Sequence, residues 1–381
     1  MTEVNAPLDT VVELRLSTPQ PELLELLATP PLAIRARRSR ETAGAFLAGP
    51  EPAAADGKAL PVATRLSRNP GFFAAEHVAI GEASVRAVDI EAAIRRFNQG
   101  ETDLVLGGGL DGLGSARVTA RRETLLLEQP RAALLLLVNQ RAPALSDLQV
   151  RQALALAVNR PALAEALFGT RNATELRALS PANIAGYAPP EPEWIASPFV
   201  LRQEQARRLL AAAGFDPLSN RLKLVVSIGG GAGEARLVEL VARDMAAVGV
   251  DLSLARRDPA AHARAVAKGD FDLALVQRET PIDSPLPFLW PYLCKRNGHG
   301  VCLPDADRLY AESWTAPTRS ARLASLAAAE RLWAGDVAAI GLLHPLGWSL
   351  VAPRVAGVSA NPSGLHSLRH LSIDPTRRLL K

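Results

Sequence analysis

The first residues that suggest chemistry form a glycine-rich stretch directly after an apolar run. Gly107–Gly112 reads GGGLDG and formally matches the dinucleotide-binding pattern G-x-G-x-x-G. In that motif the glycines let a pyrophosphate approach the start of a helix, and an acid about 20 residues later holds the ribose. Here Val118 and Thr119 lie among basic residues, and we expect no helix to open on the glycines. A loop at the carboxyl edge of a strand is expected instead, where it can line a ligand cleft.

The other candidate motifs point away from catalysis. Gly229–Gly233 follows an apolar run but lacks the Lys-[Ser/Thr] of a phosphate loop, so a strand-to-helix turn is expected, with anion contact left open. His366 and His370 are four residues apart, but their neighbours read as strand or loop, which favours two surface histidines over a metal pair. No H-E-x-x-H or G-x-S-x-G occurs. We therefore expect no catalytic residues, no metal site and no cofactor.

The two cysteines are separated by a short polar turn. Cys294 and Cys302 are eight residues apart, with Asn297, Gly298 and Gly300 between them. They could close a loop disulfide in an oxidising compartment, and the bonded and free states both stay open at this point. His299 also lies between them, but a fourth nearby ligand for a metal is missing.

Composition predicts a folded, water-exposed protein of two domains or one bilobal body. The 381 residues include 48% hydrophobic and 22% charged side chains, enough for a large core. Net charge is +4, but the bases are interleaved with acids, so no nucleic-acid partner is expected. No apolar run reaches the roughly 18 residues of a membrane span. The N-terminus lacks a basic segment followed by an apolar one, so no signal peptide is expected.

The elements that would position these residues are strongest in the middle of the chain. Leu134–Val138 is a continuous apolar run that stops at polar residues, which predicts a strand buried on both faces. Ser146–Gln149 reads as an S-x-x-Q capping box opening a helix. Asn159 is expected to cap a second helix, which ends at Gly169. Further on, residues 222–255 read as strand, helix and strand, which implies parallel strands.

This central stretch resembles the mid-chain signature of the family 5 extracellular solute-binding proteins, the peptide- and nickel-type receptors of ABC importers. Their pattern is a strand ending in Asn, a Pro-containing loop, and then D-x-x-V-R-x-A-hydrophobic-x-x-A-hydrophobic-[DN]-R. The matching residues are Asp147, Val150, Arg151, Ala153, Ala157, Asn159 and Arg160. The resemblance extends from about residue 8 to residue 373. Family members carry an export signal, the first strands of lobe I and usually an extra domain ahead of this point, and the resemblance implies that these parts are missing here.

The resemblance also covers Asp270–Pro285, which is similar to the family's cleft segment, D-[FY]-D-hydrophobic…G-W-x-x-D-x-x-D-P. In peptide-binding members an acid just after the Trp holds the amino terminus of the peptide. Here Arg278 replaces that Trp and Pro281 replaces that acid, and Asp283 could substitute only with a shifted loop. Arg278 would instead offer a fork for carboxylate or phosphate. The alternative is that Arg278 and Glu279 pair with each other on the rim.

The resemblance implies an α/β, bilobal periplasmic-binding-protein-like fold (type II, cluster C-like) with an incomplete first lobe. Residues 1–138 would form lobe I, 139–347 lobe II, and 348–381 a return segment to lobe I. The implied function is that of a substrate-binding protein, not an enzyme. It would bind a peptide-like or other small polar solute in an interlobe cleft, close by hinge motion, and deliver the solute to a membrane permease.

The resemblance and the motifs together predict a ligand site. The residues expected to contact the ligand are Gly108, Leu110, Asn139, Arg278, Glu279, Asp283 and Trp348. A monomer in the periplasm is implied, although no signal peptide is expected in this chain. Two alternatives are a truncated or cytoplasmic sensor paralogue without a transport role, and a nucleotide-dependent α/β enzyme that uses the glycine loops.

Overall fold

The computed structural model describes residues 3–8, 10–32, 43–49, 63–169, 174–374 and 376. The chain divides into two compact units, and each is discontinuous in sequence. Unit 1 comprises Met1–Ala28 and Arg131–Pro345, and unit 2 comprises Thr29–Pro130 and Leu346–Lys381. After its first passage at 28/29, the chain passes from unit 2 to unit 1 at 130/131 and back to unit 2 at 345/346. The boundaries suggested by the sequence were 138/139 and 347/348. The assignment of the units to lobes I and II stays a prediction.

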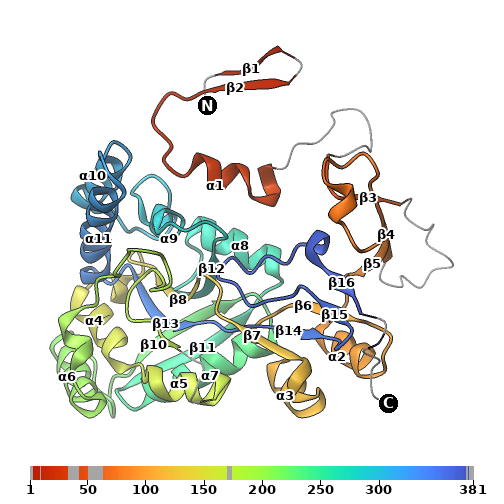
Figure 1. The fold of residues 1–381 in the computed structure, drawn as a ribbon. Helices are drawn as coiled ribbons and strands as arrows, with labels where there is room; N and C mark the ends of the chain where they lie inside the picture. The colour runs from red at the N-terminus through yellow and green to blue at the C-terminus, as the bar shows by residue number, and fades with distance from the viewer. Residues whose placement is uncertain are drawn as a thin grey trace. The chain divides into compact units, whose positions relative to one another are not determined.

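Unit 1 is built on a mixed six-stranded sheet with the strand order β11-β10-β12-β8-β13-β9. Its strands are β8 (Ala132–Val138), β9 (Thr174–Glu175), β10 (Leu222–Ile228), β11 (Val250–Arg256), β12 (Leu273–Glu279) and β13 (Ala339–His344). β10 pairs in parallel with β11, as the strand–helix–strand pattern predicted, and also with β12. β8 pairs antiparallel with both β12 and β13. All seven residues of β8 are buried, because the strand has a neighbour on each edge and helices flank the sheet (Figure 1).

The remaining elements of unit 1 are helices, plus an exposed N-terminal hairpin of β1 (Glu3–Leu8) and β2 (Val11–Arg15). The helices are α1 (Leu23–Leu27), α4 (Leu148–Ala157), α5 (Arg160–Phe168), α6 (Phe199–Ala212), α7 (Ala232–Ala246), α8 (Pro259–Lys268), α9 (Leu286–Leu289), α10 (Pro304–Ser313) and α11 (Arg319–Gly335). Short 3-10 turns occur at η4 (Pro143–Leu145), η5 (Glu193–Ala196) and η6 (Trp290–Tyr292). No helix in the described ranges is long and apolar enough to cross a membrane.

The helix starts in this unit test the capping predictions. Asn159 caps α5 as predicted, with its side chain accepting from the Ala162 N–H. The predicted capping box of α4 is wrong. The cap is Asp147, whose carboxylate accepts from the Gln149 N–H at 2.8 Å. The Ser146 hydroxyl instead donates to the Pro143 carbonyl at 2.8 Å, because the preceding 3-10 turn presents that oxygen locally.

A buried carboxylate organises one side of the unit 1 core. Glu330 on α11 is fully buried and accepts hydrogen bonds from the backbone N–H groups of Leu179 and Ser180, at 2.8 and 3.0 Å. The hydroxyls of Ser180 and Tyr187 also donate to it. Four donors from one connecting segment therefore converge on a single side chain, which ties the chain between β9 and α6 to α11.

Unit 2 contains smaller and more exposed sheets. Their strand orders are β6-β14-β7, β3-β4-β5 and β15-β16. The strands are β3 (Phe46–Ala48), β4 (Ala63–Arg68), β5 (Glu82–Arg86), β6 (Leu104–Gly108), β7 (Leu125–Glu128), β14 (Gly347–Val351), β15 (Val355–Ala356) and β16 (Ser372–Ile373). The helices are α2 (Ile90–Asn98) and α3 (Leu113–Thr119), with 3-10 turns η1 (Pro30–Leu32), η2 (Ala75–His77), η3 (Arg122–Thr124) and η7 (Leu368–His370).

The glycine-rich loop of unit 2 differs from its prediction. A helix, α3, opens directly on it with Gly112 at the N-cap position, so the expectation of no helix was wrong. Leu113 and Ala116 are buried at helical spacing, a signal that the neighbouring β-branched residues obscured. Gly112 has a φ of 73°, and a Cβ there would lie 2.7 Å from a side-chain carbon of Ile90. The glycine is therefore required by backbone conformation and by packing.

Candidate ligand-binding segment

The end of β12 is an open strand edge. β12 pairs with β8 along its whole length, from Leu273 opposite Val138 to Glu279 opposite Ala132. On its other side it pairs with β10 only at Leu273 and Ala274. Because β10 ends at Ile228, the last four residues of β12 extend beyond it, and the described chain places no strand there.

The backbone of this edge is oriented for a further chain. The Thr280 N–H donates to the Arg131 carbonyl at 3.0 Å, so residue 280 points its backbone toward the β8 side. Successive residues of a strand point their N–H and C=O groups to opposite sides, so those of Gln277 and Glu279 face away from β8. Both residues are exposed, and the Gln277 amide donates to the Glu279 carboxylate at 3.2 Å. An extended peptide could add to this edge as a strand.

A serine–histidine pair lies beside the same edge. His262 contacts the Leu275 carbonyl with Nε2 and the Ser227 hydroxyl with Nδ1, both at 2.9 Å. A carbonyl can only accept, so Nε2 carries the proton and Nδ1 accepts from the serine. Ser227 is 1% exposed and lies in the middle of the sheet. The pair therefore closes the β10–β12 boundary and offers no accessible nucleophile.

Arg278 projects to the opposite face from its two exposed neighbours. Its Nη1 donates to the Phe288 carbonyl at 3.1 Å, and its guanidinium carbon lies 4.6 Å from the ring centroid of Tyr292. No ion pair joins it to Glu279 in the described part of the chain, because alternation along the strand separates the two side chains. The predicted rim pair is therefore absent. Arg278 as a residue is half-buried, and its guanidinium is held by the Phe288 carbonyl and the Tyr292 ring.

Asp283 is already engaged by arginines of unit 1. Its Oδ1 lies 3.1 Å from Arg131 Nε and accepts from the Ala185 N–H at 3.1 Å. Its Oδ2 accepts from Arg319 Nη2 at 3.0 Å. An ammonium group would have to displace these partners. The contacts give the predicted ligand residue a role within the β12–α9 loop, while its role toward a ligand stays a prediction.

Two acids of the N-terminal segment hold the same loop, and sequence reasoning missed them. The Asp283 N–H donates to Glu25 at 2.8 Å, and the Ser284 hydroxyl donates to Glu22 at 3.3 Å. Glu22 is 3% exposed and pairs with Arg322 at 3.3 Å. The only signal in the sequence was a pair of acids three residues apart in a leucine-rich helix, which is common on solvated helix faces.

Asn139 at the end of β8 is occupied by the backbone around it. Its amide donates to the carbonyls of Gly269 and Phe271, at 3.1 and 2.7 Å, and its carbonyl accepts from the Arg141 N–H at 3.1 Å. It is 7% exposed. These bonds tie the end of β8 to the start of β12, so the residue helps to position the candidate segment.

The predicted ligand residues of unit 2 form a separate cluster around Trp348. This side chain is 0% exposed, and its Nε1 donates to the carbonyls of Gly109 and Asp111 at 3.1 and 3.3 Å. Gly108 is buried against the indole, where an added Cβ would lie 2.2 Å from a ring carbon. Leu110 is half-exposed at the tip. Trp348 and Gly108 thus shape the loop, and Leu110 is its member with exposed side-chain surface.

The cysteine loop packs against the end of β8. Cys294 and Cys302 form a disulfide, and the Asn297 amide donates to the carbonyls of Leu293 and Val301 inside the loop, at 2.9 and 2.8 Å. The carbonyl of the buried His299 accepts from the Gln140 N–H at 2.8 Å. The loop therefore braces the segment that follows β8.

His366 and His370, which are four residues apart in the sequence, do not form a pair that could hold a metal ion. His366 Nε2 lies 3.0 Å from a carboxylate oxygen of Glu128, and both side chains are buried. The expectation of a surface residue was wrong for the side chain of His366, which is 6% exposed where it meets Glu128. His370 is exposed and accepts from Arg369. Within the described ranges, no three His, Cys, Asp or Glu side chains are grouped to hold a metal ion.

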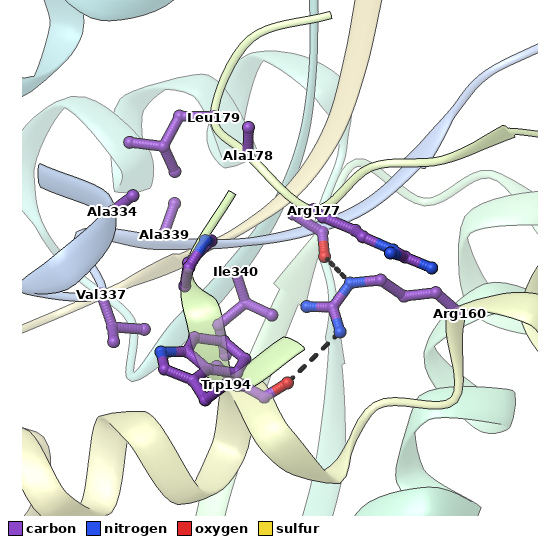
Figure 2. Close-up of a pocket in the computed structure, with 12 residues that line it drawn as sticks. Arg160, Arg177, Ala178, Leu179, Trp194, Ala334, Val337, Ala339 and Ile340 are labelled. Atoms are coloured by element: carbon purple, nitrogen blue, oxygen red, sulfur yellow. Dashed lines mark hydrogen bonds between the residues drawn. The ribbon is translucent and has the colours of Figure 1, made fainter. Parts of the chain in front are cut away.

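A small cavity lies elsewhere in unit 1, around the buried Arg160 (Figure 2). The guanidinium donates to the carbonyls of Gly341, Leu176 and Ala155 at 2.7, 3.1 and 3.3 Å. Burial is the main reason that its pKa is lowered to about 9, and the charge of Arg202 adds to the effect. The cavity volume is about 10 Å³, which accommodates about one water molecule. It is too small for a peptide-like solute.

The mixed sheet of unit 1, flanked by helices (Figure 1), is compatible with an α/β binding-protein fold. The chain belongs to the bacterial extracellular solute-binding proteins, family 5 Middle, whose family model matches residues 1–300. The bilobal α/β fold expected from sequence is thereby confirmed at the level of fold class. Members of this family are solute-binding proteins rather than enzymes.

Two curated proteins named as di/tripeptide-binding proteins are similar to this chain. It is 26% identical over 326 residues to the probable di/tripeptide-binding protein 5 of Pseudomonas aeruginosa (strain UCBPP-PA14), covering 81% of this chain and 58% of the relative. Di/tripeptide-binding protein 2 of the same strain is 22% identical over 322 residues, with the same coverage. The chain thus spans about 58% of the length of these curated relatives.

Solved structures show the same fold at lower identity. The Escherichia coli murein tripeptide binding protein MppA matches with a TM-score of 0.82 and 19% identity, over 97% of this chain and 74% of that one. Helicobacter pylori DppA in complex with the peptide STSA matches with a TM-score of 0.77 and 15% identity, over 98% and 74%. At these identities the likeness establishes the fold.

Proposed function

We propose that this chain is the substrate-binding component of an ABC importer in the periplasm, and that it binds a peptide-like or other small polar solute for a membrane permease. Family membership and the peptide-binding relatives support this role. The observation that carries it is the open edge of β12. The backbone groups of Gln277 and Glu279 point away from β8, and the described chain covers them with no strand.

This edge suits a solute with an extended amide backbone. Main-chain hydrogen bonds along a strand edge give affinity without regard to sequence, and neighbouring side chains then select the ligand. The edge is anchored at both ends. Asn139 ties the start of β12 to β8, and Asp283 with its arginine partners holds the loop that follows it. Such a pre-organised edge reduces the entropic cost of binding.

A proline substitution tests the role of the edge. Gln277→Pro removes the N–H that faces away from β8 and leaves the β8 ladder intact, while Gln277→Ala keeps that N–H. Calorimetry with acetyl-Ala-Ala-Ala-amide should show at least about tenfold weaker binding to the proline variant. The alanine variant should bind like the native chain. Equal binding by both variants, with unchanged thermal unfolding, would place the ligand elsewhere.

We further propose that the solute is not an ordinary peptide with a free amino terminus. Pro281 occupies the position of the ammonium-binding acid in the family pattern, and Asp283 is already paired with Arg131 and Arg319. Acetylating the amino termini of di- to pentapeptides should therefore leave their affinity unchanged or improve it. Tight binding that acetylation abolishes would contradict this proposal. Mass spectrometry of whatever co-purifies would identify the solute itself.

A further inference from the structure

Arg278 lies on β12 beside its open edge, and no described carboxylate forms an ion pair with it. We propose that Arg278 binds a carboxylate group of the solute, and that it selects anionic over neutral and cationic ligands. This proposal rests on the proposed solute-binding function, because it assigns the charge that the same site prefers.

The position of the guanidinium is fixed by the protein. The Phe288 carbonyl takes one hydrogen bond from Nη1, and the Tyr292 ring lies beneath the group at 4.6 Å. Tyr292 is fully buried and packs near Trp333, with ring centroids 6.0 Å apart, so the platform is part of the core. A cation held over an aromatic ring loses little further freedom when it binds a ligand. Arg278 as a residue is partly exposed, and the contacts to Phe288 and Tyr292 pre-organise its guanidinium.

Three other arginines of this region have carboxylate partners. Arg131 and Arg319 share Asp283, and Arg322 pairs with Glu22. In the described part of the chain no carboxylate forms an ion pair with Arg278. The positive charge of Arg278 also affects the buried His299. The pKa of His299 is lowered to about 4, first by burial and then by the charges of Arg278 and Arg141.

The chemistry of the fork favours a carboxylate. A guanidinium presents two parallel N–H groups at the spacing of carboxylate oxygens, and such charge-assisted bonds are roughly twice as strong as neutral ones. Nearby acids do not compete for the fork, because Glu279 projects to the other face of the strand and Asp283 is occupied. A ligand that lies along residues 277–279 would pass the backbone of Arg278, so an acidic end or side chain could reach the guanidinium.

Four probes that share one backbone separate charge from shape. All are tri-alanine peptides: acetyl/amide (neutral), succinyl/amide (carboxylate at the amino end), acetyl/free acid (carboxylate at the carboxyl end) and free amine/amide (cationic). Calorimetry with the full chain should show at least one anionic probe binding about tenfold or more tighter than the neutral one. The cationic probe should bind more weakly than the neutral one. The anionic probe that gains affinity gives the direction of the ligand.

Variants assign the preference to Arg278. Arg278→Gln should remove the anionic advantage and leave binding of the neutral probe within about twofold, while Arg278→Lys should keep part of the advantage because it retains charge without the fork. Arg296 is a matched control, since its guanidinium lies 4.8 Å from the Trp290 ring in the same part of unit 1. Arg296→Gln should leave the order of the probes unchanged. Thermal unfolding without ligand checks that each variant folds.

The outcomes distinguish this proposal from the one beneath it. Equal affinity for all four probes would overturn the carboxylate site while leaving the solute-binding role in place. Loss of the neutral probe together with the anionic ones in Arg278→Gln would show a purely structural role for Arg278. If no probe binds, both proposals fail. Displacement of the anionic probe by inorganic phosphate at lower concentration than by acetate would overturn the carboxylate assignment in favour of a phosphoryl group.

Discussion

Glu330 in unit 1 and Trp348 in unit 2 perform the same task by opposite means. Each is completely buried and each holds a connecting segment in place. Glu330 does so with hydrogen bonds, by accepting four from the segment that contains Ser180 and Tyr187. Trp348 does so with shape, because its ring fills the space that the absent side chain of Gly108 leaves.

The difference indicates how each unit would fail. Without the carboxylate, several buried donors lose their hydrogen-bond acceptor. Each unsatisfied donor costs about 1–3 kcal/mol. Removing the indole leaves a cavity that collapses only in part. Unit 1 should therefore be sensitive to substitutions that change polarity, and unit 2 to substitutions that change volume.

The largest expected effect comes from Glu330→Ala, which should lower the free energy of unfolding by about 5 kcal/mol. Chemical denaturation with guanidinium measures it. Glu330→Gln is the control that keeps volume. It should cost less than alanine, because its carbonyl still accepts while its NH₂ group faces other donors. An alanine variant as stable as the native chain would show that water replaces the carboxylate.

Trp348→Ala should cost about 4 kcal/mol, and the loss should be confined to unit 2. Limited proteolysis should then cut within unit 2 while unit 1 stays protected. Trp348→Phe keeps much of the volume but loses the N–H bonds to Gly109 and Asp111, so it should cost clearly less. If the phenylalanine variant is as damaged as the alanine one, hydrogen bonding rather than shape holds the loop.

Acid should destabilise unit 1 through two buried histidines. Burial is the main cause that lowers the pKa of His299 to about 4 and that of His344 to about 4. In the unfolded chain histidine titrates near a pKa of about 6.5, so the unfolded state takes up protons first as pH falls. Stability is therefore complete above this value and decreases down to about pH 4, by roughly 3 kcal/mol for each histidine.

The measurement is the free energy of unfolding between neutral pH and the acid limit of that window, for the native chain and for His299→Gln and His344→Gln. Each variant should show a shallower slope. Burial raises the pKa of Glu330, which acts in the opposite sense, since stability from that group is lost as pH rises through its folded pKa. Because Glu330 is present in all three proteins, its contribution cancels in the comparison of slopes. Parallel slopes would contradict the prediction.

The smallest expected effect belongs to Asp283→Asn, at about 1 kcal/mol. The substitution weakens the pairs with Arg131 and Arg319, but the aspartate side chain is 23% exposed, so solvent already screens them. Glu312→Gln offers a control, since it breaks a single exposed pair with Arg308 and should change stability by less. A loss of stability for Asp283→Asn as large as that for Glu330→Ala would contradict this prediction. It would mean that the ion pairs of the loop contribute as much to stability as the buried carboxylate.

Local patterns predicted the parts of this fold that local chemistry decides. The buried strand β8, the Asn159 cap and the parallel arrangement of β10 and β11 all follow from apolar runs, capping residues and element order. The family signature reached further, because its spacing encodes a whole strand–loop–helix unit. The cap of α4 was misplaced by one residue, since Ser146 and Asp147 are both good caps and the preceding turn decided between them.

The candidate site was less predictable because burial and long-range partners decide it. Trp348 and Asn139 were expected to contact ligand, yet their polar atoms are used by backbone groups. Nothing near Glu25 in the sequence reveals that it accepts from Asp283. The open edge of β12 depends on where β10 ends relative to it, which is a matter of register between strands. Only the tertiary structure fixes that offset.

The hydrogen bonds from the β12–α9 loop to Glu22 and Glu25 of the N-terminal segment have a consequence for synthesis. Glu25 and Asp283 are 258 positions apart in the chain. At a translation rate of about 5–20 residues per second, Glu25 waits roughly 13 to 52 s on the ribosome before its partner is made. Through that interval the hydrogen bond between the Asp283 N–H and Glu25 cannot form. The contact between Glu25 and Asp283 is therefore a late step of biogenesis. It forms only when the two separate pieces of unit 1, Met1–Ala28 and Arg131–Pro345, have come together.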